Sequence, residues 1–298
     1  QPELPDQIRT HPLNLPARAT CTADAVTPDA NDAILLSESI IGAYHHRLTL
    51  EDAVMRCLFV VLLTCALLSG CASPPRDPSG TWINQAAIDA AVEGGNLREA
   101  LLAYGPNLEW QIDSQRRLAS FSNGFERDEG SVDRGPAGQL RVHFYGDFQE
   151  SLSLSGDELI QAQSDTWPEQ RFVRAPAAPG PLAPPGSSFE QALYSAYLGG
   201  TWVIQEGLGE GGLVLFQADG SVQGLPGAER YALCLAGDCA AMSGEFDSLW
   251  LQLGEQGQNW LFEREGKQLR VFEALNRSQI DEMPNFYKGQ QRWLLQQR

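Results

Sequence analysis

The sequence predicts a mainly β protein with two tandem small antiparallel β-barrel or β-sandwich domains that carry short helices. The chain contains 29 Gly and 18 Pro, which is typical of turn-rich β proteins rather than of helical bundles. Short β-prone segments alternate with turn residues along much of the chain. The sequence Gly-Thr-Trp, followed by Ile or Val, opens such a series twice, at Gly80 and at Gly200.

The first 54 residues show no sustained strand or helix periodicity. The first methionine of the chain is Met55, which stands directly before an apolar segment. We therefore expect residues 1–54 to be an over-extended reading of the gene upstream of a start at Met55. The alternatives are a disordered leader and a true extension with a short helix over 33–44.

Residues 55–70 have the layout of an export signal. Arg56 supplies a positive charge, and the apolar segment Cys57–Leu68 follows it. This segment spans 12 residues, whereas a membrane-spanning helix needs about 20. The alternative, a buried core element, is disfavoured because Pro74 and Pro75 follow and would break it. We therefore expect a signal peptide at 55–70.

The signal ends in Leu68-Ser69-Gly70-Cys71, which resembles the lipobox of bacterial lipoproteins. The resemblance implies that Cys71 receives a diacylglycerol, that cleavage before Cys71 frees the mature chain, and that fatty acyl chains such as palmitate anchor it. Two or more buried acyl chains give stable membrane binding. Ala72 and Ser73 follow the cysteine, as in lipoproteins of the outer membrane. The resemblance therefore implies lipid anchoring on the periplasmic side of the outer membrane.

Two Pro-rich segments divide the mature chain. Residues 71–79 are expected to form a tether. Residues 177–188 combine prolines with an absence of charge, which predicts a semi-rigid linker. We therefore expect a first β domain with a helical insertion at 80–176 and a second β domain at 189–298.

In the first domain, the spacing of apolar residues predicts a helical insertion over Ala86–Ala103, divided into two short helices by Gly94-Gly95. After the opening strand at Gly80, strands are expected at 108–113, 117–122, 140–145, 151–154 and 159–164.

In the second domain, apolar residues at a spacing of four predict a short helix over 189–198. Asp219-Gly220 is a strong hairpin turn, and Ala236-Gly237-Asp238 is expected to form another. A turn of helix is expected at 276–284. The expected strands are 201–205, 213–216, 221–224, 231–235, 240–242, 249–253, 260–263, 269–274 and 286–295.

The Gly-x-Trp opening resembles that of lipocalins and other small calycin-like barrels. In those proteins the Trp closes one end of the barrel and a late Arg packs over it. Trp82 and Trp202 match the Trp, and Arg174 and Arg270 are candidate partners. Because each domain is shorter than a lipocalin barrel, we do not extend ligand binding to this chain. The alternative is that each Trp is an ordinary core aromatic.

In addition to Cys71, the mature chain contains two cysteines, Cys234 and Cys239. An even number of cysteines in an oxidising compartment favours a disulfide. They flank the expected turn at Ala236-Gly237-Asp238, so we expect them to face each other across a hairpin as a structural disulfide. The alternatives are a redox-active pair or half of a metal site, although redox pairs are usually Cys-x-x-Cys on a helix.

His143 is the sole histidine after Cys71, so any Ser-His-Asp site would have to use it and any zinc site would have one imidazole at most. Its alternating segment, Arg141–Tyr145, predicts an ordinary strand residue. We therefore expect no catalytic residue, no metal and no cofactor.

The formal net charge of −17 argues against nucleic acid or an anionic membrane surface as a partner. The glycine-rich segment Gly207–Gly212 lacks the Lys and the following helix of a nucleotide-binding loop. Five carboxylates on expected turns leave a carboxylate-dependent hydrolase open as an alternative. They are Glu206, Glu210, Asp219, Asp238 and Glu245.

The expected function is that of a non-enzymatic outer-membrane lipoprotein that binds an envelope protein or a small ligand, or supports an envelope assembly. The alternatives are an inhibitor or immunity-type lipoprotein against a lytic enzyme, a carboxylate-dependent periplasmic hydrolase, and a structural tether. Filled barrels would favour protein binding, whereas an enclosed acidic cleft would favour the hydrolase.

Replacing Cys71 by alanine tests the lipid anchor. The wild-type protein should incorporate a fatty-acid analogue and sediment with membranes, and Cys71→Ala should do neither because the acceptor thiol is gone. Cys234→Ser is the matched control and should label like the wild type. Equal labelling of Cys71→Ala would contradict the lipobox interpretation.

Overall fold

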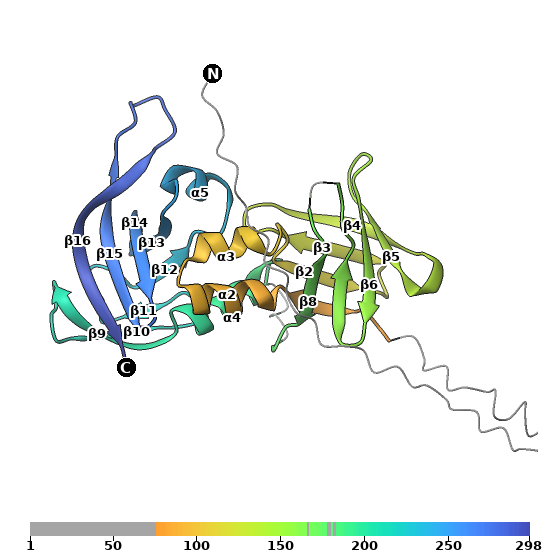
Figure 1. The fold of residues 1–298 in the computed structure, drawn as a ribbon, viewed down its shortest axis with the longest axis horizontal. Helices are drawn as coiled ribbons and strands as arrows, with labels where there is room; N and C mark the ends of the chain where they lie inside the picture. Colours follow the sequence, from red (N-terminus) through yellow and green to blue (C-terminus); the bar gives the residue numbers. More distant parts are fainter. Residues whose placement is uncertain (1–75, 166, 178–179, 181–182) are drawn as a thin grey trace, which may run out of the picture. The chain divides into compact units, whose positions relative to one another are not determined.

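Two antiparallel sheets of eight strands each make up the part of the chain that the computed structural model describes, residues 76–165, 167–177, 180 and 183–298 (Figure 1). The predicted mainly β fold with short helices is confirmed. The expected signal at 55–70 and the expected lipidation residue Cys71 lie outside the described residues. Among the described helices, none combines the length and the apolar character needed to cross a bilayer.

The first sheet is a closed barrel in which each strand pairs with the next and β8 returns to β1. Alternate side chains point inward, and Trp82, Trp110, Phe121, Phe144 and Phe172 are the aromatic members of its core. Closure leaves the barrel without a free sheet edge. The strands are β1 (Gly80–Ile83), β2 (Glu109–Asp113), β3 (Leu118–Ser122), β4 (Arg127–Arg134), β5 (Leu140–His143), β6 (Gln149–Ser155), β7 (Glu158–Gln161) and β8 (Gln170–Arg174).

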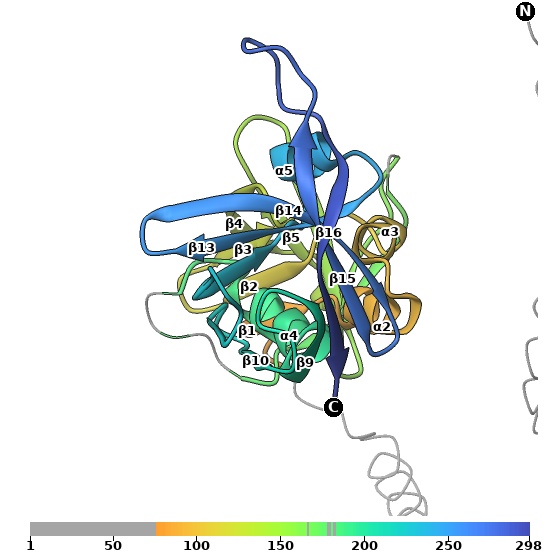
Figure 2. The same ribbon diagram turned by 90° about the vertical axis from the view of Figure 1, so that its left-hand side faces the viewer.

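The second sheet has the strand order β11-β10-β9-β16-β15-β14-β13-β12. Its two outermost strands approach each other through an isolated bridge between Ser221 and Arg230, so the sheet is barrel-like. The hairpin between β15 and β16 extends past the other strands (Figure 2). The strands are β9 (Gly200–Gly207), β10 (Leu213–Phe216), β11 (Val222–Gln223), β12 (Arg230–Leu233), β13 (Asp247–Leu253), β14 (Gln256–Glu265), β15 (Gln268–Asn276) and β16 (Phe286–Gln297).

Both barrels open with the same tryptophan contact. The indole N–H of Trp82 donates to the Pro78 carbonyl, and that of Trp202 donates to the Leu198 carbonyl, at 2.8 Å in each case. Both carbonyls lie four residues before the tryptophan, and both side chains are buried. The repeated sequence Gly-Thr-Trp therefore builds the same local structure twice.

Arg174 covers the tryptophan of the first barrel. It pairs with Trp82 across β8 and β1, and its guanidinium carbon lies 4.2 Å from the indole centroid. The same guanidinium donates to the carbonyls of Ser79 at 2.7 Å and Asp77 at 2.8 Å. One side chain thus ties the last strand to the segment that precedes the first.

In the second barrel, Gln297 occupies the position opposite the tryptophan that Arg174 occupies in the first. Gln297 pairs with Trp202 across β16 and β9, and its side-chain amide donates to the Gly199 carbonyl at 3.1 Å. The candidate partner Arg270 lies instead on β15, where it forms an ion pair with Glu265. It does not take the expected place because β16 separates β15 from β9.

Three helices lie between the two sheets in Figure 1 and share one apolar core. They are α2 (Gln85–Gly94) and α3 (Leu97–Ala103), between β1 and β2, and α4 (Ser187–Tyr197), before β9. The two helices at Ala86–Ala103 were predicted, including their division at Gly94-Gly95. Their buried residues, such as Ile88 and Leu97, join the core of the second sheet rather than that of the barrel from which they branch.

A carboxylate of the first barrel caps α4. Glu109 on β2 is completely buried, and its oxygens accept the N–H groups of Gly186 at 2.9 Å and Phe189 at 2.8 Å. The first N–H groups of a helix have no partner within the helix, and a negative charge is favourable there. Glu109 therefore fixes the start of α4 against β2.

A carboxylate of the second sheet likewise caps α3, which belongs to the first half of the chain. Asp247 on β13 is buried and accepts the N–H groups of Leu97 and Arg98, both at 2.8 Å. Each half of the molecule thus supplies one carboxylate to a helix that starts in the other half. These contacts join residues far apart in the sequence.

Three of the secondary-structure predictions were wrong. Residues 240–242 belong to a helix, α5 (Gly237–Ser243), because the run of small and apolar residues is too short to distinguish helix from strand. The expected turn at Ala236-Gly237-Asp238 is the start of that helix, and 276–284 forms bends and turns without a helix. Strands β4 and β8 were not predicted, and β4 buries two of its eight residues.

Asp247 should make stability depend on pH. Burial raises its pKa above the ordinary value, although the N–H groups of Arg98 and Leu97 lower it in part. A carboxyl with a raised folded-state pKa stabilises the fold below the unfolded-state value, about 3.9, and loses this contribution as pH rises through the folded-state pKa. The free energy of unfolding of the wild type, relative to Asp247→Asn, should therefore fall as pH rises through this window.

Urea unfolding at a series of pH values, followed by tryptophan fluorescence, measures this difference. Asp147→Asn, at an exposed turn, is the control for the loss of one surface charge. A relative stability of the wild type that increases with pH would contradict the assignment.

Candidate functional site

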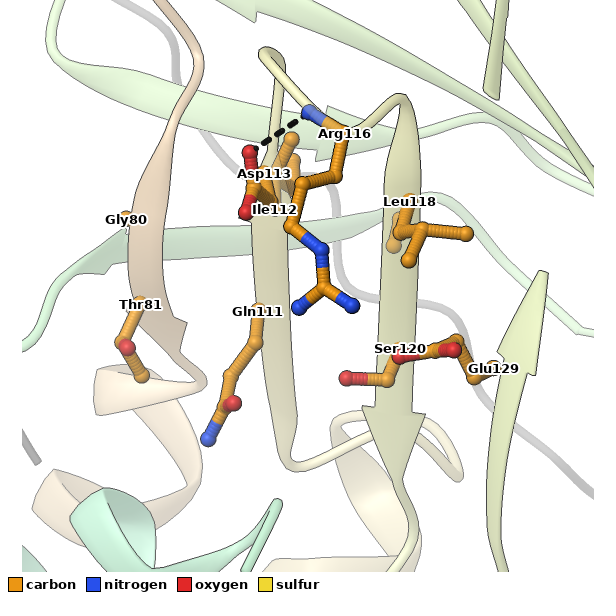
Figure 3. Close-up of a pocket in the computed structure, with 10 residues that line it drawn as sticks. Gly80, Thr81, Gln111, Ile112, Asp113, Arg116, Leu118, Ser120 and Glu129 are labelled. Carbon is orange, nitrogen blue, oxygen red and sulfur yellow. Dashed lines mark hydrogen bonds between the residues drawn. The ribbon is translucent and has the colours of Figure 1, made fainter. Parts of the chain in front are cut away.

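The outer face of the first barrel carries a polar groove of 240 Å³ over β1 to β4 (Figure 3). Figure 3 shows the Arg116 guanidinium in the groove between Gln111 and Ser120. The Asp113 carboxylate accepts the Arg116 backbone N–H at 2.9 Å and so holds the turn that places this arginine. The residues that line the groove include no His, Cys or Lys. The groove offers hydrogen-bonding groups, among them the Ser120 hydroxyl and the Glu129 carboxylate, which occupy paired positions on β3 and β4.

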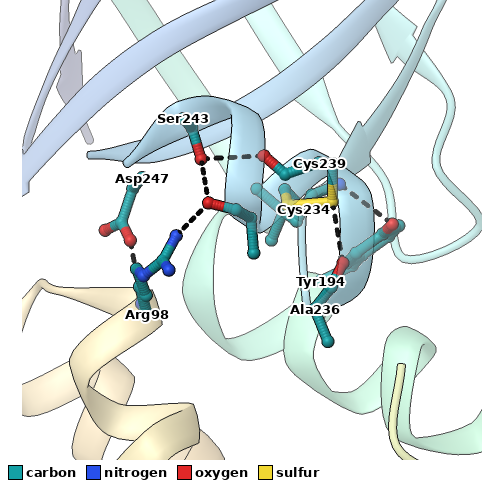
Figure 4. Close-up of a disulfide and its surroundings, with 9 residues drawn as sticks. Arg98, Tyr194, Cys234, Ala236, Cys239, Ser243 and Asp247 are labelled. Carbon is teal, nitrogen blue, oxygen red and sulfur yellow. Dashed lines mark hydrogen bonds between the residues drawn. A yellow bond between two sulfur atoms is a disulfide. The ribbon is translucent and has the colours of Figure 1, made fainter. Parts of the chain in front are cut away.

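Cys234 and Cys239 form the predicted pair, with sulfur atoms at disulfide distance and Cα atoms 5.8 Å apart (Figure 4). Their setting differs from the expected hairpin, because Cys234 follows β12 and Cys239 lies in α5. The bond therefore closes a short loop between a strand and a helix. Cys71, the expected lipid-attachment residue, lies outside the described residues.

The disulfide-closed loop forms one wall of an apolar pocket. Leu235 and Ala236, between the two cysteines, line this pocket. Gly237 follows with φ +67, and a Cβ atom there would lie 2.1 Å from the Phe125 ring. The absence of a side chain at Gly237 therefore lets the loop approach the turn between β3 and β4 closely.

The apolar pocket has a volume of 140 Å³. Its Asn123 side chain is the one polar amide in the lining, and its oxygen already accepts the N–H groups of Phe125 and Glu126 within its own turn. Leu102 and Trp167 line the pocket and are 66% and 44% exposed, so the opening is apolar too. The lining residues are Leu101, Leu102, Gly105, Pro106, Leu108, Asn123, Trp167, Leu235 and Ala236.

Polar contacts beside the pocket hold its walls together (Figure 4). The Arg98 guanidinium donates to the Ala240 carbonyl, which links α3 to α5. The Ser243 hydroxyl donates to the Cys239 carbonyl at 2.9 Å and closes the end of α5. The Tyr194 hydroxyl accepts the Leu233 N–H at 3.1 Å, and burial raises the pKa of Tyr194 to about 12. The tyrosine is therefore a neutral structural group at neutral pH.

Side chains occupy the interior of the first barrel. Its aromatic core includes Phe121 and Phe144, whose rings meet edge to face at 5.3 Å. Toward one end, Gln161 accepts hydrogen bonds from the Asn107 amide at 2.9 Å and the Trp110 indole at 3.1 Å. The apolar pocket lies outside this core, because its lining residues are not members of the barrel core.

His143 is placed as an ordinary strand residue at the end of β5. Its Nε2 atom lies 3.4 Å from a carboxylate oxygen of Asp133, and its side chain is 40% exposed. Asp133 also forms an ion pair with Arg117, so it is not dedicated to the histidine. Within the described residues, no cluster of three or more His, Cys, Asp or Glu has an arrangement that could hold a metal ion.

The five carboxylates predicted on turns are not brought together in one cleft. Asp219 accepts hydrogen bonds from the Ser221 side chain and backbone, which lower its pKa. Glu245 lines a polar pocket of 410 Å³ with Asp247 and Lys288, but the Asp247 carboxylate is used by α3, and Lys288 forms an ion pair with Glu263. Glu206, Glu210 and Asp238 do not line that pocket.

The apolar pocket has no local sequence motif. Its residues come from α3, from the loops around Asn123 and Trp167, and from the disulfide loop. The sequence feature that could have pointed to this pocket is that large apolar residues such as Trp167 and Phe125 lie outside the predicted strands. Comparison with protein-family models, with curated proteins and with solved structures finds no match to the chain.

Removing the disulfide should weaken the fold modestly. The closed loop is short, so the entropy model gives a stabilisation of about 2 kcal/mol for the bond. Cys234→Ser/Cys239→Ser should lower the free energy of unfolding by about that amount, and reduction of the wild type should have a similar effect. Urea unfolding with and without reductant measures the change. A double variant that is insensitive to reductant but as stable as the oxidised wild type would contradict a structural role.

Proposed function

We propose that this chain is a lipid-anchored protein of the outer membrane, held at Cys71 on the periplasmic side, and that its folded part is a non-enzymatic module that binds another envelope protein. The observation that carries the proposal is the apolar pocket at the disulfide loop. It is open, lined by apolar side chains, and lies outside a barrel interior that is already filled.

The size of the pocket favours a protein side chain over a free small molecule. Pockets for drug-sized ligands measure about 300–1,000 Å³, whereas this one measures 140 Å³. A single large apolar side chain fits that volume better. Such an anchor in a desolvated pocket, surrounded by further contacts, is typical of the centre of a protein–protein interface.

The polar groups support a binding role over catalysis. The buried carboxylates Glu109 and Asp247 each accept two backbone N–H groups, so helix capping accounts for them. His143 is partly exposed beside a carboxylate that also pairs with Arg117. Residues 71–298 contain 30 of the 38 acidic residues and 17 of the 21 Lys and Arg residues of the chain, and this excess of negative charge favours a partner with a basic surface.

Capture of partners by the mature, lipidated protein from its own envelope tests the proposal. A Leu102→Asp/Trp167→Ser variant places a charge in the pocket and shortens its rim. We expect recovery of the partner to fall at least tenfold, which corresponds to about 1.4 kcal/mol. Because both side chains are partly exposed, the variant should keep wild-type thermal stability.

Tyr145→Ser is the matched control, because Tyr145 is 97% exposed and does not line the pocket. It should recover the same partner as the wild type. Equal recovery by the pocket variant and the wild type, with both folded, would contradict the proposed site. Loss of recovery in the control as well would show that the contact is not located at the pocket.

A further inference from the structure

The hairpin of β15 and β16 ends in an arm, residues 274–288, that projects past the rest of the second sheet in both Figure 1 and Figure 2. The strands remain paired along it, with Ala274 opposite Lys288 and Asn276 opposite Phe286. Bulges at Phe272 separate the arm from the regular part of the sheet. Such irregularities bend and re-aim a strand pair.

The loop at the end of the arm is held by its own hydrogen bonds. The Asn276 side-chain oxygen accepts the N–H groups of Ser278 at 3.0 Å and Asn285 at 3.2 Å. The Arg277 guanidinium lies 4.4 Å from the centroid of the Tyr287 ring, and the Arg277 N–H donates to the Asn285 carbonyl at 3.2 Å. The tip therefore has a defined backbone before any partner binds, which reduces the entropy lost on binding.

This ordered loop presents large apolar side chains to solvent. Ile280 is 102% exposed and Met283 is 57% exposed. Leu275 and Tyr287, which face each other across the arm, are 44% and 37% exposed. Isolated exposed apolar residues are common, but four on one pre-ordered projection are a candidate contact. The fold does not use Ile280, because none of its surface is buried.

The charged residues at the tip indicate which kind of apolar partner fits the arm. Asp281 and Glu282 stand directly between Ile280 and Met283 in the sequence, and both are exposed. The arm also carries Arg277, which packs on the Tyr287 ring, and Lys288, which forms an ion pair with Glu263. Asp281 and Glu282 are therefore the charges next to Ile280 and Met283 in the sequence, and anionic lipid head groups or a second copy of this acidic chain would repel them. A protein cleft with an apolar floor and a basic rim complements both features at once.

We propose that the arm inserts Ile280 and Met283 into an apolar cleft of a partner protein whose rim carries Lys or Arg opposite Asp281 and Glu282. The arm is then the convex contact of the module, separate from the concave apolar pocket. This inference rests on the proposed function only in requiring that the module binds a protein.

Site-specific photocrosslinking in cells that make the full lipidated protein tests the arm. A photoreactive amino acid replaces Ile280 in one strain and Tyr145 in a control strain, because both positions are fully or almost fully exposed. Position 280 should give one discrete protein adduct, and position 145 should not give it. With the crosslinker at 280, Asp281→Lys should reduce that adduct at least tenfold, while thermal unfolding is unchanged. Glu282 is left in place because its carboxylate accepts the Gln279 N–H within the loop.

Other outcomes overturn the proposal. These are adducts to phospholipid, an adduct to a second copy of the chain, equal adducts from both positions, no adduct from 280, or an adduct that charge reversal leaves intact. The pocket variant separates the two proposals. If Leu102→Asp/Trp167→Ser loses the captured partner but position 280 gives no adduct, the arm proposal fails and the binding function stands. If no partner is captured and no adduct forms, both fail.

Discussion

The apolar core beneath α2, α3 and α4 is the constraint on which the rest of the structure depends. Helices of 7 to 11 residues are marginal in water by themselves, so these three need tertiary burial to form. The core of the second sheet supplies that burial, while Glu109 and Asp247 satisfy the N–H groups at two of the helix starts. The insertion from one barrel completes the core of the other.

The apolar pocket follows from this arrangement. One wall is α3, which Asp247 and Arg98 fix to the second sheet and to α5. The opposite wall is the disulfide loop, which approaches Phe125 closely because Gly237 has no side chain. The pocket therefore combines residues from both halves of the described chain. It exists once the halves are packed together, and neither half alone contains all of its lining.

The molecule presents two kinds of apolar surface, and both lie outside the barrel cores. The pocket is concave and bounded by structured loops, whereas the arm is convex and carries Ile280 at its end. A filled barrel gives such surfaces a rigid support, because close-packed interiors resist deformation. These two surfaces and the acidic composition are the observations on which the proposed binding of a basic protein partner rests.

The sequence by itself determined the mainly β class, the helix break at Gly94-Gly95 and the pairing of Cys234 with Cys239, because each depends on residues close together in the chain. Regular alternation also located strands such as Leu213–Phe216. The tertiary structure alone decided the course of β4, whose charged sequence is extended because β3 and β5 pair with it. It also decided that Glu109 and Asp247 cap two helices and that the apolar pocket forms. It placed Gln297, and not Arg270, opposite Trp202. Local periodicity reports which side of one segment is buried, whereas strand order and long-range contacts follow from the free energy of the whole packed chain.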